Sequence, residues 1–152
     1  RIGGLEKADV IGSVSYDPDN HHRMVTLRAE KVARIANDVA DLTVFGEPEG
    51  DLLILGWGST FGAIRSATER LLTKGRRVGH AQMRHLNPFP RNTEAVLRSY
   101  RRVVIPEVNL GQLLLLVRGR FLIDAVGYNR VRGKPFRIAE IEEQAERLLS
   151  EL

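Results

Sequence analysis

The sequence predicts one doubly wound α/β domain, in which helices cover both faces of a parallel sheet. Three observations lead to this fold class. The chain has 152 residues, which suits one domain with a hydrophobic core. Its composition, 43% hydrophobic and 28% charged, is that of a globular protein. Short apolar runs alternate with amphipathic stretches, and short loops rich in glycine and proline join them.

The predicted domain covers residues 19–152. Residues 1–18 contain glycines and polar residues without a regular period, so we expect an irregular lead-in segment there. Short apolar runs predict strands at residues 42–45, 51–55, 77–83, 102–105 and 123–126. Amphipathic patterns predict helices at residues 19–38, 61–74, 92–100, 110–121 and 138–152. This alternation of strand and helix is the basis of the α/β assignment.

The first helix follows Asp17-Pro18-Asp19, a sequence typical of turns. Its apolar residues recur roughly at helical spacing, at Met24, Leu27, Val32 and Ile35. The spacing predicts an amphipathic helix that ends before the first strand.

Residues 51–83 form the clearest unit. The run from Asp51 to Leu55 is apolar almost throughout, as expected for a strand that is buried on both faces. The next helix is expected to end at Gly75, because glycine commonly follows the last turn of a helix. Residues 77–83 then supply a second strand. The unit therefore reads strand–helix–strand, and its crossover should be right-handed.

The second half of the chain continues the alternation. Pro106 is expected to stop the strand at residues 102–105. The helix at residues 110–121 is apolar nearly all round at Leu113–Val117, which predicts either burial in the domain or contact with another subunit. The terminal helix is amphipathic and closes the predicted domain.

The composition excludes several kinds of chemistry. The chain has no cysteine, so it has no disulfide, thiolate nucleophile, Cys-ligated zinc or iron–sulfur cluster of its own. The net charge of +4 comes from cations spread along the chain, which is most simply a solvated surface. The first residue is Arg1 rather than methionine, so we expect a piece of a longer chain. No signal peptide and no apolar run near the roughly 20 residues of a membrane span is present, which predicts a cytoplasmic location.

A glycine-rich loop at residues 56–62 follows the buried strand and precedes a helix. Gly58, Ser59 and Thr60 are candidates for an anion site, because a helix N-terminus offers free N–H groups and partial positive charge. The simpler alternative is that Ser59 or Thr60 caps the helix. A third alternative is a dinucleotide site for NADP, although the spacing is GxGxxxG, and Arg84 stands where an acidic ribose ligand is typical.

Polar side chains follow the strands that end near Met83 and Pro106. Arg84, His85 and Asn87 lie in a loop with two prolines, and Asn109 and Gln112 precede or begin the helix after Pro106. Since open α/β folds bind ligands at the carboxyl edge of the sheet, these five residues are candidates for lining a ligand entrance. Arg84 could grip a carboxylate with two hydrogen bonds. The alternatives are a rigid structural loop with an exposed arginine, and a capping role for Asn109.

Further polar residues have simpler explanations. His80 lies in a predicted strand and is expected to be a buried histidine with satisfied hydrogen bonds, and His21 and His22 are expected at the surface. Glu107 should rise at the same sheet edge as Asn109. No catalytic triad or metal-ligand spacing stands out.

A basic loop spans residues 128–137 and carries Arg130, Arg132 and Lys134 among its cations, with no acidic residue. Such a loop could bind a polyphosphate, an acidic partner or RNA. A solvated surface loop is the alternative.

Four motifs in the predicted domain occur in a fixed order: Leu55-Gly56-Trp57-Gly58-Ser59-Thr60, Arg84-His85-Leu86-Asn87-Pro88-Phe89-Pro90, Ile105-Pro106-Glu107-Val108-Asn109-Leu110-Gly111-Gln112 and Arg132-Gly133-Lys134-Pro135-Phe136. They resemble the motifs of the α subunits of 2-oxoacid:ferredoxin oxidoreductases, most closely the two-subunit 2-oxoglutarate enzymes of actinobacteria. In the lead-in, Gly4-Leu5-Glu6 and Val14-Ser15-Tyr16-Asp17 resemble the segment before this domain in that family. The resemblance covers nearly the whole chain.

This resemblance implies a three-layer α/β/α fold like the transketolase C-terminal domain, with a mostly parallel five-stranded sheet. It implies an enzyme that decarboxylates a 2-oxoacid on thiamine diphosphate and Mg2+, passes electrons through a 4Fe-4S cluster to ferredoxin, and transfers the acyl group to coenzyme A (CoA). These cofactors are expected mainly with the β subunit and none on this chain. The expected partners are the β subunit and the remaining α-subunit domains, and the chain alone is expected to be inactive.

Two other functions stay open at this point. One is an NADP-binding module that uses the glycine loop and Arg84. The other is a basic nucleic-acid-binding domain centred on residues 128–137. The resemblance favours the oxidoreductase subunit over both.

Overall fold

The computed structural model describes residues 5–152 of the chain, so Gly4 of the lead-in motif lies outside the described residues. Within them, one five-stranded sheet has the order β1-β3-β2-β4-β5. Only β1 is antiparallel, and it pairs with β3; the other pairs are parallel. The strands are β1 (Val44–Gly46), β2 (Gly50–Trp57), β3 (Val78–Met83), β4 (Tyr100–Glu107) and β5 (Val126–Asn129). The expected mostly parallel sheet is confirmed.

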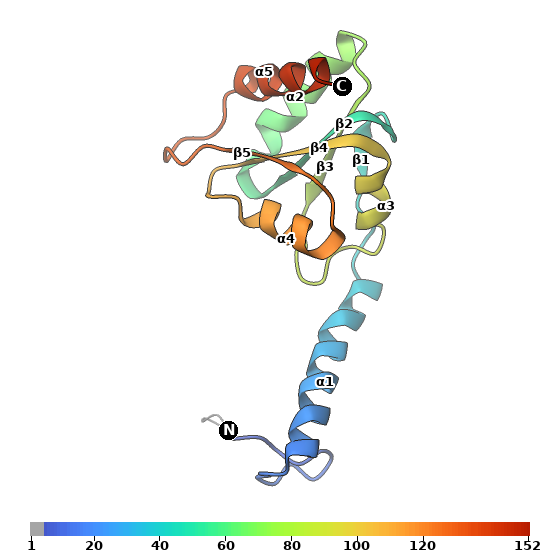
Figure 1. The fold of residues 1–152 in the computed structure, drawn as a ribbon, viewed down its shortest axis with the longest axis vertical. Helices are drawn as coiled ribbons and strands as arrows, with labels where there is room; N and C mark the ends of the chain where they lie inside the picture. The colour runs from blue at the N-terminus through green and yellow to red at the C-terminus, as the bar shows by residue number, and fades with distance from the viewer. Residues whose placement is uncertain (1–4) are drawn as a thin grey trace.

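Helices cover both faces of this sheet, which confirms the three-layer architecture. In Figure 1, α2 and α5 lie on one side of the sheet, and α3 and α4 lie on the other. The helices are α1 (Pro18–Arg34), α2 (Phe61–Thr73), α3 (Thr93–Arg98), α4 (Gln112–Phe121) and α5 (Ile138–Ser150), with short 3-10 helices at Ile35–Asn37 and Gly58–Thr60. As predicted, α2 stops before Gly75, whose φ of +74° suits glycine.

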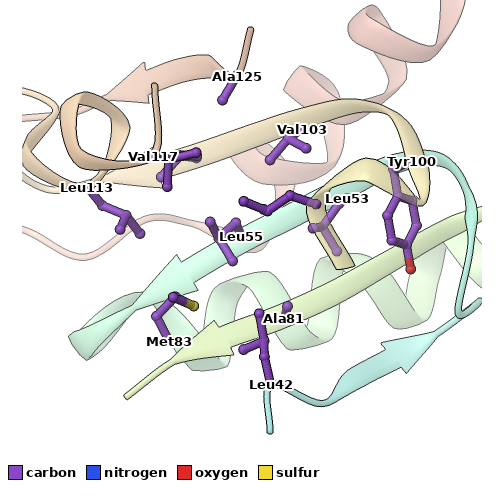
Figure 2. Close-up of a cluster of buried hydrophobic side chains, with 12 residues drawn as sticks. Leu42, Leu53, Leu55, Ala81, Met83, Tyr100, Val103, Leu113, Val117 and Ala125 are labelled. Carbon is purple, nitrogen blue, oxygen red and sulfur yellow. The ribbon is translucent and has the colours of Figure 1, made fainter. Parts of the chain in front are cut away.

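Strand β2 is the centre of the hydrophobic core. Leu53 and Leu55 pack with α3 and α4 on one face, whereas Leu52 and Ile54 pack with α2 and α5 on the other. Figure 2 shows the first of these clusters, with Leu113 of α4 beside Leu55. The apolar run predicted a strand buried on both faces, and the two clusters confirm it.

Two strand boundaries differ from the prediction. Strand β4 continues through Pro106 to Glu107. Its pairing with β2 ends at Val104, so beyond that residue β4 pairs only with β5, and an edge position tolerates proline. Strand β5 starts at Val126 and includes Tyr128, which was expected in the basic loop.

Helix α4 is buried in the domain along one side only, and contact of its other side with another subunit stays a prediction. Leu113 and Val117 are buried against the sheet, whereas Leu115 is 74% exposed on the other side. Leu122 ends the helix with a left-handed φ of +52° and is 86% exposed.

Helix α1 stands away from the sheet as a long arm, with the N-terminal segment at its far end (Figure 1). None of its described residues is buried. We call residues 5–41 the arm and residues 42–152 the α/β body. The expectation that residues 19–152 form one domain stays a prediction.

The lead-in segment folds back onto the first turns of α1. Lys7 and Val14 form an isolated antiparallel bridge. Glu6 accepts hydrogen bonds from Arg28 Nη1 and Nη2 at 3.1 and 3.0 Å and lies 3.0 Å from His21 Nδ1. Hydrogen bonding to Arg28 is the main reason that the pKa of Glu6 falls to about 2. These contacts order the far end of the arm.

Asn92 fixes the point where the arm meets the body. Its Oδ1 accepts from Leu42 N at 2.8 Å, and its Nδ2 donates to Leu42 O at 2.9 Å. The side chain thus pairs with the backbone of Leu42 as a neighbouring strand would. Since Leu42 is also buried in the core, the segment that leads into β1 has a fixed place.

Candidate functional site

The carboxyl ends of the central strands form one rim. Trp57 at the end of β2 is in register with Met83 at the end of β3. Strand β4 runs parallel to β2 and ends at Glu107 beside Trp57. The structure therefore confirms that the loops after β2, β3 and β4 lie along a single edge of the sheet, where open α/β folds bind ligands.

Glu107 holds two of these loops together. Its carboxylate is fully buried, and Oε1 accepts from Trp57 Nε1 at 3.0 Å and from Leu113 N at 2.8 Å. Its Oε2 accepts from Leu114 N at 3.1 Å. The N-terminus of α4 is thus satisfied by the chain's own carboxylate, which leaves no place there for an external anion. The sequence placed Glu107 at this edge but did not reveal that it reaches Trp57.

The glycine loop does not use a hydroxyl to cap α2. Residues Gly58–Thr60 form a 3-10 turn, and the Thr60 hydroxyl donates to Trp57 O at 2.9 Å. Thr60 thus occupies the N-cap position of α2, as one alternative predicted, but its hydroxyl makes no hydrogen bond to the helix amides. Gly58 has a φ of +59°, which glycine adopts without strain, and its carbonyl accepts from Gln82 Nε2 at 3.2 Å.

Gly56 allows the closest packing in this loop. A Cβ atom at Gly56 would lie 2.4 Å from Gln82 Oε1 and 2.6 Å from Ile64 Cδ1. A larger residue would displace the ends of these two side chains. The first glycine of the loop therefore lets Gln82 and Ile64 lie close to β2.

A pocket of about 530 Å³ opens at the β3 end of the rim. Arg84 and His85 line it, and both side chains are exposed, so a ligand can reach them. The opposite wall is the segment of residues 39–45 that Asn92 holds in place. The volume is within the range of small-ligand sites. The sequence could not indicate this wall, because the pairing of an edge strand with β3 has no local signature.

Aromatic rings form the inner side of the pocket. The rings of Phe61 and His80 lie 5.5 Å apart, and the Arg65 guanidinium carbon lies 3.1 Å from the centre of the Phe45 ring. His80 is buried, as expected, and its Nε2 lies 3.3 Å from Gln82 Oε1. Burial is the main cause that lowers the pKa of His80; the hydrogen bond with Gln82 acts in the opposite direction, and Arg65 adds to the lowering. The pocket thus combines cationic and aromatic groups with one carboxylate, Asp41. Its arginines suit an anionic group of a ligand, and its rings suit an aromatic group.

The other three predicted rim residues, Asn87, Asn109 and Gln112, do not line this pocket. Asn109 Oδ1 accepts from Gly111 N at 2.8 Å and from Gln112 N at 3.0 Å. The side chain thus binds the first amide of α4, although the N-cap residue is Gly111 and not Asn109 as predicted. Gln112 is exposed on the outer side of α4, and Asn87 is exposed in the proline loop. Neither of these two is among the residues that line the pocket. The structure brings Arg84 and His85 together in one cavity, but not with Asn109 or Gln112.

The basic loop is partly neutralised by its own chain. Arg132 pairs with Glu140 of α5, and Tyr128 and Phe136 stack with ring centres 5.3 Å apart. Arg130 begins at the rim, where its N–H donates to Glu107 O at 2.9 Å. A shallow pocket of about 280 Å³ lies beyond it, lined by Arg132, Lys134, Pro135, Arg137 and Glu140. The loop therefore presents less free positive charge than its sequence predicts.

Residues 5–152 contain no group of three or more side chains suited to bind a metal ion. In the same range, none of the helices is both long enough and apolar enough to cross a bilayer.

The fold and the rim define an open α/β domain with a ligand-facing carboxyl edge. The particular family follows from sequence comparison. Residues 50–144 match the family described as pyruvate:ferredoxin oxidoreductase core domain II, and the chain belongs to this family. It is 48% identical to the 2-oxoglutarate oxidoreductase subunit KorA of Mycobacterium tuberculosis over 143 residues, which are 93% of this chain and 21% of that subunit.

Solved structures agree with this assignment. A 2-oxoglutarate:ferredoxin oxidoreductase from Magnetococcus marinus, with 2-oxoglutarate, coenzyme A and succinyl-CoA bound, matches 97% of this chain and 26% of its own, with 31% identity and a TM-score of 0.90. The α chain of a probable 2-oxoacid ferredoxin oxidoreductase from Thermoplasma acidophilum matches 72% of this chain and 97% of its own, with 26% identity and a TM-score of 0.50.

The fold itself is that of transketolase-like domains. A split-gene transketolase matches 71% of this chain and 41% of its own, with a TM-score of 0.54 at 18% identity, and this likeness concerns the fold alone. The implied transketolase C-terminal-like fold is thus confirmed. The named relatives give no support to the NADP-binding or nucleic-acid-binding alternatives.

Proposed function

We propose that this chain is the C-terminal α/β domain of the α subunit of a 2-oxoglutarate:ferredoxin oxidoreductase, and that its rim lines the entrance for substrate or coenzyme A. One observation carries the proposal. The pocket with Arg84 and His85 lies at the carboxyl edge of the sheet. The same fold occurs in a 2-oxoglutarate:ferredoxin oxidoreductase with bound coenzyme A, which matches this chain with a TM-score of 0.90. The chain spans 21% of subunit KorA, so the remaining reaction machinery belongs to parts outside it.

Within this proposal, Arg84 and His85 contact an anionic group of the ligand. A carboxylate suits a 2-oxoacid and a phosphate suits coenzyme A, and a guanidinium can bind either with two hydrogen bonds. Phe61 and His80 supply an aromatic side to the same pocket. The glycine loop at Gly58, Ser59 and Thr60 and the basic loop at Arg130, Arg132 and Lys134 are secondary candidates. Asn87, Asn109 and Gln112 shape the rim beside the pocket.

The proposed enzyme requires cofactors that other parts of the assembly hold. Thiamine diphosphate, Mg2+ and a 4Fe-4S cluster are placed mainly with the β subunit, and this chain has no cysteine to ligate a cluster. The proposed partners are that β subunit, the remaining α-subunit domains and, through the complex, ferredoxin. We also propose a cytoplasmic location, the compartment that the sequence predicts. On this proposal the chain alone has no activity.

Substitution of Arg84 in the complete enzyme tests the proposed role. Arg84→Ala removes one charged contact, worth about 1.5–3 kcal/mol, so kcat/KM for 2-oxoglutarate or for coenzyme A should fall roughly 10- to 100-fold. Steady-state kinetics with each substrate varied in turn show which ligand depends on Arg84.

Arg77→Ala is a matched control for this substitution. Arg77 is exposed at the opposite end of β3, away from the rim, so its loss should leave both efficiencies unchanged. Unchanged kcat/KM for both substrates in Arg84→Ala would remove the entrance role from this pocket.

A further inference from the structure

Helix α1 has an apolar face that nothing in the described chain covers. Val25, Val32 and Ile35 are 46%, 39% and 47% exposed. With Ala29 and Ala36 they recur at spacings of three and four residues, so they share one side of the helix. An amphipathic helix of a globular protein normally packs such a face against a core.

The arm is stabilised only near its far end. The lead-in is tied to α1 through Arg28, and through Arg23, whose Nη2 lies 2.8 Å from Asp9 Oδ2. The last six residues of α1, 29–34, receive no such support from residues 5–17 in the described structure. Isolated helices of this length are marginal in water, so this end of α1 needs an external partner to be stable.

The lengths of two solved relatives support one occupant for this face. The M. marinus enzyme matches 97% of this chain with a TM-score of 0.90, which requires that its arm and body have the same relative placement as here. The chain of that enzyme is about four times as long as the matched region. The T. acidophilum protein matches 72% of this chain. The α/β body makes up nearly the same share, 111 of the 152 residues or 73%. Because the match covers 97% of the T. acidophilum chain, that protein is a chain of about the size of the body alone.

We infer that the apolar face of α1 is a docking surface for the part of the same subunit that lies outside these 152 residues. This inference rests on the proposed function, because it requires that the chain be one piece of a long α subunit. The docked region must be an apolar groove, since Val25, Ala29 and Val32 carry no charge. The arm then holds the body at a fixed angle to the rest of the subunit, which places the rim relative to the other active-site domains.

Hydrogen exchange of the α1 amides tests the inference. The amides of residues 29–37 should exchange at least about 100-fold more slowly in the complete α subunit than in the 152-residue chain, because docking suppresses local opening. Val32→Lys in the complete subunit should abolish most of this protection. Glu30→Lys introduces the same side chain on the opposite side of the helix and should leave the protection intact.

Three results would overturn the inference. The amides could exchange equally fast in both proteins, which means that nothing in the subunit covers α1. The 152-residue chain could dimerise and show the same protection, which assigns the face to a second copy. Protection could appear only after the β subunit is added, which assigns the face to that partner.

The kinetics of Arg84→Ala separate this outcome from the failure of the proposed function. Slow exchange at α1 together with unchanged kinetics of Arg84→Ala would support the docking surface and contradict the entrance role of the rim pocket. Fast exchange at α1 together with impaired kinetics would support the entrance role and contradict the docking surface.

Discussion

The α/β body and the arm are built from similar proportions of apolar and charged residues but use them differently. In the body, strand β2 is buried on both faces, and Leu52, Leu53, Ile54 and Leu55 are fully inaccessible. In the arm, the described residues of α1 include none that is buried, and polar contacts such as Glu6 with Arg28 hold its far end. The body therefore carries its own core, whereas the arm is a helix whose apolar face none of the described residues covers.

The difference separates two kinds of stability in one chain. The body should unfold cooperatively as one unit, because its two hydrophobic clusters share the same sheet. The arm should fray independently of the body in the isolated chain, since none of the described residues of α1 is buried.

The largest expected difference concerns core substitutions. Leu53→Ala leaves a cavity at the centre of the body and should lower the free energy of unfolding of the isolated chain by about 2–5 kcal/mol. Val32→Ala in the arm should change it by less than about 0.5 kcal/mol, because Val32 is not buried there. Urea titration followed by Trp57 fluorescence measures both. Comparable losses for the two variants would contradict the separation of body and arm.

Glu107→Gln should have an intermediate effect and should act at the rim. The amide keeps one acceptor but places an N–H group among three donors, Trp57 Nε1, Leu113 N and Leu114 N, so about 1–3 kcal/mol should be lost. The same titration applies, with Glu143→Gln on the exposed side of α5 as the matched control. If both variants were equally stable, the buried carboxylate would not hold the rim together.

The smallest expected effect has opposite signs at two exposed leucines of α4. Leu122 has a φ of +52°, where glycine is less strained, so Leu122→Gly should stabilise the body by about 1 kcal/mol. Leu115→Gly lies within the helix and should destabilise it by about 1 kcal/mol. Thermal unfolding of both variants provides the measurement, and a loss of stability in Leu122→Gly would contradict the account of this helix end.

Much of the body could be predicted because its signals are local. The apolar run at residues 51–55 indicates burial on both faces. Gly75 follows the end of a helix because the backbone there has a positive φ, which glycine adopts more easily than other residues. Parallel strands then place Arg84 and Glu107 at one edge without further information.

The features that sequence analysis missed depend on contacts between distant residues. Glu107 reaches Trp57, and Asn92 reaches Leu42, each across 50 positions in the chain. Asn92 was expected only as the start of a helix, yet its side chain binds the segment that forms one wall of the pocket. The helical period predicted α1 correctly, but a period shows which side of a helix is apolar and not what covers it.

Hydrogen exchange of the complete enzyme with and without coenzyme A tests the central claim most directly. If the rim lines the entrance, saturating ligand should slow exchange in the loop at residues 84–90 and in the facing segment at residues 39–45, while residues 131–134 of the basic loop stay unchanged. Protection confined to the basic loop, or absent from residues 84–90 with both coenzyme A and 2-oxoglutarate, would contradict the assignment of the rim pocket.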